Sequence, residues 1–180
     1  MSAPDVRPTG QERAFGHDEI IVTKTDLQGR ITYANDVFCR VSAMDEADVM
    51  GRPHNLIRHP DMPGGVFRLL WQRLQTGQEL FAYVVNLAAD GSHYWVFAHV
   101  TPTFDDAGAV IGYHSNRRSP SRHAVQAVEP LYREMCRTEE MSGGSVQAAE
   151  AGYRLLEERI GDLGQSYDRF VWGLTSGRAA

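Results

Sequence analysis

Lysine is nearly missing from this sequence, and acidic residues outnumber basic ones. The 180 residues contain 18 Lys and Arg against 23 Asp and Glu, which gives a formal net charge of -5, and the only lysine is Lys24. A nucleic-acid surface needs clustered cations that displace counterions from phosphates. The acidic balance therefore argues against nucleic acid as a partner.

Cysteine is scarce as well, and long apolar runs are absent. Cys39 and Cys136 are far apart, which suits a reducing compartment better than a disulfide scaffold or a four-ligand zinc site. The sequence has no run of 18 apolar residues and no secretory signal pattern, so we expect a soluble, cytoplasmic chain with no direct membrane span. No metal site is expected, because five histidines lack cysteine or histidine neighbours at ligand spacing: His17, His93, His99, His114 and His123.

Motifs for covalent or metal catalysis are also missing. The sequence has no nucleophile elbow, no phosphate-binding glycine loop and no zinc-hydrolase helix. His59 and Asp61 have the chemistry of an acid and base pair, but no nucleophile stands near them in the sequence. We therefore expect that the protein is not an enzyme.

Apolar residues, by contrast, are abundant enough for a real core. They make up 42% of the chain, and 180 residues suit one domain of ordinary size plus an extension. We divide the chain into an N-terminal cap (1–18), a central domain (19–119) and a C-terminal helical extension (120–180). The cap is rich in proline, glycine and polar residues, which predicts loose packing.

The central domain contains both strand and helix patterns. Five β-branched or apolar runs bounded by turn residues predict strands at 20–25, 30–33, 80–87, 93–104 and 109–117. Between the second and third runs, Asn35 is placed to cap a short helix, and apolar residues from Val66 to Leu74 predict a longer helix that ends at Gly77. This order predicts an α+β domain whose antiparallel sheet is covered on one face by helices.

The extension has helical patterns, and we expect helices at about 121–139 and 145–174. Apolar residues in the second helix recur in steps of three and four, which is typical of a helix that packs along a narrow seam. Its three glycines each weaken the helix by about 1 kcal/mol relative to alanine, so the seam needs a covering surface. Its own domain or a second copy of the chain would supply one.

The segment His54–Pro63 combines several polar side chains with rigid prolines within ten residues. It contains two histidines, an arginine, an aspartate and two prolines. Proline fixes its own φ and discourages helix at the preceding residue, so we expect a bent connector after one short helical turn. Such a segment suits the wall of a binding site.

Five sequence phrases together resemble the PAS sensor domain of bacterial aerotaxis receptors. They are TDLQGRITYAND (25–36), GRPHN (51–55), RHPDMP (58–63), DGSHYWV (90–96) and AVEPLY (127–132). The resemblance extends from residue 10 to residue 135. It implies the PAS fold, a five-stranded antiparallel sheet with short helices on one face, to which this chain adds C-terminal helices.

The resemblance also implies a function, namely a sensory domain that binds FAD and signals redox state or oxygen in a chemotaxis-type (aerotaxis) pathway. The cofactor contacts that it implies are Arg58, His59, Asp61, Asn35, Asn86, Phe67, Trp71, His54 and Asn55. The planar guanidinium of Arg58 suits a phosphate, and the amide of Asn86 suits the polar edge of a ring. The alternatives are a local salt bridge among Arg58, His59 and Asp61, a backbone hydrogen bond for Asn86, and core packing for Phe67.

The expected partner is a signalling protein of such a pathway or a second copy of the chain, with residues 146–174 as the candidate dimer surface. Two alternatives stay open: a PAS module that binds haem through a histidine, and a cofactor-free module that acts by dimerisation or partner docking. The second is suggested by a departure from the family, whose members commonly have tryptophan and glycine where this chain has Leu80 and Ala82. We expect that departure to lie near the cofactor.

Overall fold

The fold is described from a computed structural model, in which residues 6–175 are described. The ends of the predicted cap (1–5) and of the extension (176–180) lie outside this range. The elements are β1 (Ile21–Thr25), β2 (Ile31–Ala34), α1 (Asp36–Ser42), α2 (Glu46–Val49), the 3-10 helix η1 (His54–Ile57), α3 (Gly64–Gln75), β3 (Leu80–Leu87), β4 (His93–Phe104), β5 (Val110–Arg118), α4 (Arg122–Glu140), α5 (Ser145–Asp162) and α6 (Tyr167–Thr175).

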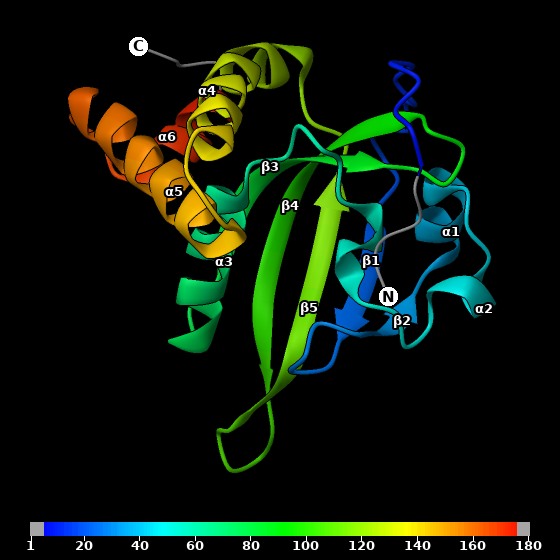
Figure 1. Cartoon of the computed structure of the whole chain (residues 1–180). Helices are drawn as coiled ribbons and strands as arrows, with labels where there is room; N and C mark the ends of the chain where they lie inside the picture. Colours follow the sequence, from blue (N-terminus) through cyan, green and yellow to red (C-terminus); the bar gives the residue numbers. More distant parts are fainter. Residues whose placement is uncertain (1–5, 176–180) are drawn as a thin grey trace.

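The five strands form one antiparallel sheet in the order β2-β1-β5-β4-β3. The short helices α1 and α2 lie beside β1 and β2, whereas α3 and the extension α4–α6 lie at the β3 end (Figure 1). The predicted α+β class and the five-stranded antiparallel sheet are confirmed. No helix within residues 6–175 is long and apolar enough to cross a membrane.

Two local signals explain why the helices begin and end where they do. Asn35 caps α1, since its Oδ1 accepts a hydrogen bond from the Phe38 amide at 3.1 Å. The same Oδ1 accepts from the Val22 amide at 3.0 Å, which ties the cap to β1. Gly77 follows α3 with φ of 75°, the left-handed conformation that favours glycine after a helix.

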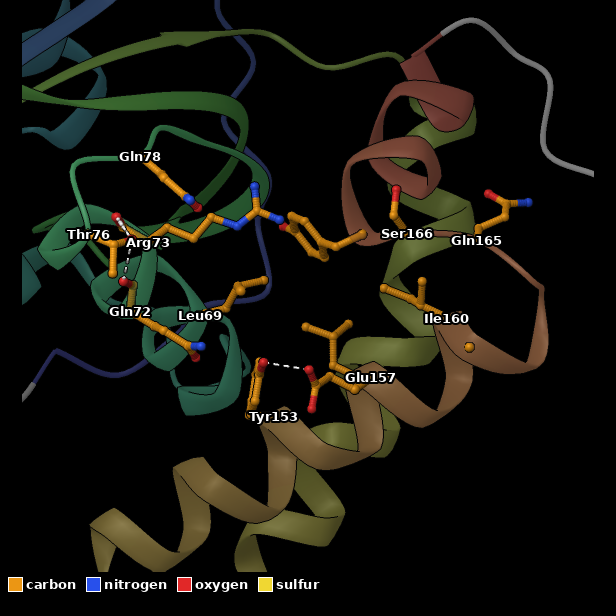
Figure 2. A pocket seen from close by; sticks show the side chains of 13 residues that line it. Leu69, Gln72, Arg73, Thr76, Gln78, Tyr153, Glu157, Ile160, Gln165 and Ser166 are labelled. Atoms are coloured by element: carbon orange, nitrogen blue, oxygen red, sulfur yellow. Dashed lines mark hydrogen bonds between the residues drawn. The ribbon is translucent and has the colours of Figure 1, made fainter.

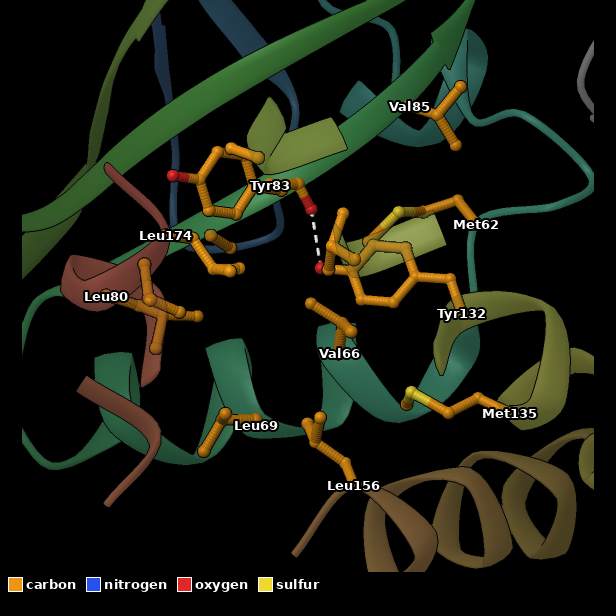
Figure 3. Packing of buried hydrophobic residues seen from close by; sticks show 14 of the residues in the cluster. Met62, Val66, Leu69, Leu80, Tyr83, Val85, Tyr132, Met135, Leu156 and Leu174 are labelled. Atoms are coloured by element: carbon orange, nitrogen blue, oxygen red, sulfur yellow. Dashed lines mark hydrogen bonds between the residues drawn. The ribbon is translucent and has the colours of Figure 1, made fainter. Parts of the chain in front are cut away.

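The core consists of two clusters of buried side chains. The first lies between α3, β3 and the extension, and Figure 3 shows Leu69, Leu80, Tyr132 and Leu156 among its members. The second lies under α1 and η1 and includes Ile21, Phe38, Val41, Ile57 and Tyr94.

The single helix predicted at 145–174 is wrong, because the structure has two helices there. Gly164 takes φ of 64°, and its amide donates to the Gly161 carbonyl at 2.8 Å, so the chain turns before α6 begins. Apolar residues recur at steps of three and four across the turn as well, so the apolar pattern alone did not reveal the turn.

The seam of α5 and α6 is covered by the chain's own domain. Leu156, Ile160, Val171 and Leu174 are each at most 3% exposed and join the first core cluster with α3, α4 and β3. Of the two coverings left open by the sequence, the single chain therefore uses its own domain. A dimer through residues 146–174 would have to use side chains outside this seam.

The described part of the cap is not loosely packed, contrary to expectation. The Thr9 amide donates to the Gly91 carbonyl at 2.8 Å, and the Arg13 amide donates to the His93 carbonyl at 2.7 Å. The Arg13 side chain also pairs with Asp90. Backbone pairing with the start of β4 compensates for the small apolar content of the cap.

Candidate ligand site

A cavity of about 330 Å³ lies between the sheet and the helices η1 and α3. Its walls come from β1, η1, the connector that follows η1, α3, β3, β4 and β5. Most of its lining is apolar, including Ile57, Leu70, Val84, Ala98 and Val100. A concave, mostly apolar space with few polar groups is typical of a small-molecule site.

Six of the nine residues implied by the resemblance line this cavity. They are His54, Asn55, Arg58, Phe67, Trp71 and Asn86. They reach it from η1, the connector, α3 and β3, segments that are separated by up to about thirty positions in the sequence. The fold thus brings together most of what the sequence phrases singled out.

The other three residues do not line the cavity. Asn35 is used as the cap of α1, and its Nδ2 also donates to the Ile20 carbonyl at 2.8 Å. The His59 ring is buried and its Nδ1 accepts from the Asp61 amide at 3.1 Å, while the Asp61 side chain is 85% exposed. Burial lowers the pKa of His59, partly opposed by the nearby Asp61 carboxylate. These side chains shape the connector and lie away from the cavity.

Arg58 lines the cavity and also braces the connector. Its Nε and Nη2 donate to the Met62 carbonyl at 3.3 and 2.9 Å, and its guanidinium lies 5.0 Å from the centroid of the Phe67 ring. Its backbone forms an isolated antiparallel bridge with Asn86. The arginine that the sequence assigned to a phosphate is therefore engaged by the protein itself.

Arg117 of β5 lines the same cavity and was not among the expected site residues. It is only 5% exposed, and its Nη2 donates to Thr23 Oγ1 at 3.0 Å and to His54 Nε2 at 2.6 Å. In the described part of the chain no ion pair joins it to a carboxylate, and burial lowers its pKa to about 10. It stays protonated at neutral pH, so the cavity contains an unbalanced positive charge.

The charge of Arg117 determines the state of His54. Burial, followed by the nearby guanidinium, holds the pKa of His54 well below its ordinary value, so the ring is neutral. A guanidinium can only donate hydrogen bonds, so Nε2 is the acceptor and the ring proton lies on Nδ1.

A sequence signal for Arg117 does exist. Tyr113, Ser115 and Arg117 alternate along β5 and all line the cavity. The alternation places Arg117 on the same inward-facing side of β5 as Tyr113 and Ser115. An arginine on such a side is unusual, because buried charged side chains need partners.

Three buried polar atoms of cavity-lining residues have no hydrogen-bond partner among residues 6–175. They are Asn86 Nδ2, Ser115 Oγ and Arg117 Nη1. Buried polar atoms are nearly always paired, and an unpaired one costs free energy. They come from β3 and from β5, on either side of β4, so a molecule that filled the cavity could form hydrogen bonds with both strands.

Leu80 and Ala82 do not line the cavity. They are 1% and 5% exposed within the first core cluster. On β3 the cavity wall is formed by Val84 and Asn86, further along the strand. The expectation that Leu80 and Ala82 lie near a cofactor stays a prediction.

A second cavity of about 550 Å³ lies between α3, α5 and α6. Figure 2 shows Arg73 of α3 beside it and Tyr153 facing Glu157 of α5. Unlike Arg117, Arg73 is neutralised, since its Nη1 lies 2.9 and 3.0 Å from the two carboxylate oxygens of Asp168. Residues 6–175 contain no group of three or more His, Cys, Asp or Glu arranged to hold a metal ion.

Comparisons with known proteins agree with this architecture. The family model of the PAS fold matches residues 20–115. The aerotaxis receptor of Escherichia coli (strain K12) is 39% identical over 125 residues, which are 69% of this chain and 24% of the receptor. The nitrogen fixation regulatory protein of Klebsiella pneumoniae is 28% identical over 102 residues, which are 57% of this chain and 21% of that protein. The chain thus spans less than a quarter of the length of either relative.

Solved structures support the fold independently. A Light-Oxygen-Voltage domain studied with a flavin analogue has a TM-score of 0.55 at 18% identity, over 64% of this chain and 86% of that one. The PAS match covers more than half of the chain, and the resemblance to aerotaxis receptors is confirmed. The chain therefore belongs to the PAS fold family.

Proposed function

We propose that this PAS domain binds FAD with the flavin ring in the 330 Å³ cavity and serves as a sensor of redox state or oxygen in a chemotaxis-type pathway. The observation that carries the proposal is the group of unpartnered polar atoms on Asn86, Ser115 and Arg117 around one apolar cavity. The similarity to an aerotaxis receptor and to a domain studied with a flavin analogue supports the same cofactor class.

The chemistry of the cavity fits a flavin ring. A flavin has an apolar end and a polar edge with carbonyl oxygens, ring nitrogens and one N–H, and when bound it supplies reversible electron uptake. The Asn86 amide can donate and accept, the Ser115 hydroxyl can do either, and Arg117 favours negative charge on the group opposite it. Ligand pockets span about 300–1,000 Å³, so this cavity suits a ring system more than a whole dinucleotide.

The alternative cofactors fit less well. For haem, an imidazole nitrogen must be free to bind iron, but His54 Nε2 accepts from Arg117, and His114 Nε2 lies 3.2 Å from Asn116 Oδ1. For a cofactor-free module, side chains should fill the cavity, and here it stays open. Both observations favour the flavin proposal.

The proposed role is sensory and not enzymatic, in the cytoplasm, with a signalling protein of a chemotaxis-type pathway or a second copy as partner. The flavin would act through its effect on hydrogen bonds of the cavity wall. A change of redox state shifts the protein only if the two states of the flavin bind two conformations with different affinity.

Titration of flavin-free protein with FAD, and separately with FMN, tests this proposal. We expect flavin absorbance bands on the protein and quenched flavin fluorescence. Ser115→Ala should weaken binding about 2- to 10-fold, the value of one buried hydrogen bond of about 0.5–1.5 kcal/mol. Ser145→Ala is the matched control, because this serine is exposed at the start of α5 and does not line the cavity. Protein that takes up neither flavin, or that shows a Soret band after haem addition, would contradict the proposal.

A further inference from the structure

The N-terminus of α3 is capped by a residue from α4. Pro63 occupies the capping position and has no side-chain hydrogen bond to offer. Instead, Glu139 Oε2 accepts from the Gly64 amide and Oε1 accepts from the Gly65 amide, both at 2.8 Å. A carboxylate at a helix N-terminus is favoured by the helix dipole and by the free amides there. The connector after η1 thus ends on a side chain of the extension.

Helix α5 closes over the same carboxylate. A Cβ at Gly152 would overlap Glu139 Oε1 and lie 2.8 Å from its Cδ. A Cβ at Gly65 would overlap backbone atoms of Gly152 and Tyr153, which cannot move aside as a side chain can. Two glycines therefore let α3 and α5 approach so closely that Glu139 is held between three helices.

The connector touches α4 at two further points. Cys136 Sγ donates to the Asp61 carbonyl at 3.4 Å, and burial raises the pKa of this thiol to about 11, so it keeps its proton. Met62, fully buried, shares the first core cluster with Met135 (Figure 3). Met135, Cys136 and Glu139 lie within one turn of α4, so a single turn meets the connector from Asp61 to Gly65.

The other end of the connector forms the cavity wall. Arg58 lines the cavity and donates to the carbonyl of Met62, two residues before α3 begins at Gly64. A displacement of Arg58 would therefore also move Met62 and the amides of Gly64 and Gly65. If those amides withdraw, the half-buried Glu139 carboxylate loses both partners, which is unfavourable.

We propose that Glu139 is the coupling element between the cavity wall and the helical extension, so that the position of residues 58–65 sets how firmly α5 docks on α3. Its use as a signal output depends on the proposed flavin function; the coupling itself does not. Coupling of this kind is reciprocal, so loosening α5 must also change the ligand affinity of the cavity.

Amide hydrogen exchange on flavin-free protein tests the coupling first. Glu139→Gln removes the negative charge and one of the two acceptor oxygens. We expect the amide exchange rate in α5 to rise at least fivefold. Unchanged exchange rates in the strands would show that the variant is folded. Glu140→Gln is the matched control, because this neighbour is exposed and changes charge equally. Arg58→Gln should also accelerate exchange in α5, but not further when combined with Glu139→Gln. Additive effects, or a Glu139→Gln variant like its control, would overturn the proposal.

A second measurement uses FAD-loaded protein before and after reduction with dithionite. We expect reduction to change exchange in α5 of the wild type, and this difference to be lost in Glu139→Gln and in Gly152→Ala, where the added methyl displaces the carboxylate. A redox difference that persists in both variants would overturn the proposal. If the wild type binds no flavin, the proposed function fails, and the flavin-free double variant still decides the coupling.

Discussion

Arg117 of β5 and His54 of η1 meet inside the cavity, with Nη2 of the arginine 2.6 Å from Nε2 of the histidine. Thr23 accepts from the same Nη2, and Nη1 has no hydrogen-bond partner in the part of the chain that the structure describes. A buried cation held only by neutral acceptors is costly to the fold, and such costs concentrate at functional sites. The arrangement therefore predicts opposite effects on stability and on ligand binding when Arg117 is replaced.

Replacement of Arg117 by methionine should stabilise the ligand-free protein and weaken flavin binding. Replacing buried ion pairs by apolar side chains of similar size is often neutral or stabilising by about 1–4 kcal/mol. Within residues 6–175 Arg117 has no carboxylate partner that its replacement would leave unpaired, so the same direction is expected here. Arg117 is the only buried cationic side chain that lines the cavity within residues 6–175. Its loss should therefore weaken FAD binding at least tenfold. Thermal unfolding without ligand and flavin titration measure the two effects.

Arg118→Met is the control for this variant, since Arg118 is exposed at the end of the same strand. It should leave both quantities nearly unchanged. A ligand-free Arg117→Met protein that is strongly destabilised would show instead that the guanidinium holds β1, β5 and η1 together, and that its role is structural.

The depressed pKa of His54 predicts acid sensitivity of the fold. In the unfolded chain this histidine has an ordinary pKa of about 6.5, so below that pH the unfolded state binds the additional proton. The free energy of unfolding should then fall as pH decreases below about 6.5, by at most about 1.4 kcal/mol per pH unit, until the folded pKa is reached. Urea denaturation at pH 7.5 and 5.5 measures this loss.

His54→Gln isolates the contribution of His54, because glutamine keeps an acceptor for Arg117 but does not titrate. The loss between pH 7.5 and 5.5 should become smaller in this variant. His59, whose pKa is also lowered, contributes in the same direction and remains in both proteins. His123→Gln, on the exposed face of α4, is the control that should keep the full loss.

The sequence predicted the fold well where local signals and tertiary packing agree. The five strands were predicted within one or two residues, because turn residues bound each apolar run. The turn at Gly164 was missed, since the apolar steps continue through it, and the backbone pairing of the cap with β4 depends on partners that are distant in sequence. Neither feature has a local pattern.

The site was predicted in part, for a similar reason. Phrases around His54 and Arg58 identified one wall, but the opposite wall lies on β1 and β5, whose contribution depends on which strand face points inward. Arg117 stands next to Arg118, and only the alternation along β5 distinguishes the buried arginine from the exposed one. Asp61, in contrast, belongs to the phrase RHPDMP (58–63) and still faces solvent.

The turn between α5 and α6 predicts opposite effects for two neighbouring glycines. Gly161 lies within α5, and a Cβ added there would have no atom within 4 Å. Gly161→Ala should therefore raise the free energy of unfolding by about 0.5–1 kcal/mol. Gly164 has φ of 64°, where alanine is strained, so Gly164→Ala should destabilise by about 1 kcal/mol. Chemical denaturation of both variants measures the pair. Stabilisation by Gly164→Ala would indicate that the helix continues through this position, as the sequence pattern alone suggested.

Tyr132 connects the extension to the edge of the sheet, and we expect its hydroxyl to contribute measurably to the free energy of unfolding. The buried phenol donates to the Tyr83 carbonyl at 2.7 Å (Figure 3), and burial keeps its pKa well above the ordinary value, so it remains a donor. Since β3 is an edge strand, that carbonyl depends on the extension for a partner. Tyr132→Phe keeps the ring but leaves a buried acceptor unsatisfied, and it should lower the free energy of unfolding in urea by about 1–3 kcal/mol.

Tyr33→Phe is the control, because this tyrosine ring on β2 is exposed, and the variant should leave the free energy of unfolding almost unchanged. Equal effects of the two variants would mean that water replaces the Tyr132 hydroxyl and that α4 docks on β3 through apolar contacts alone.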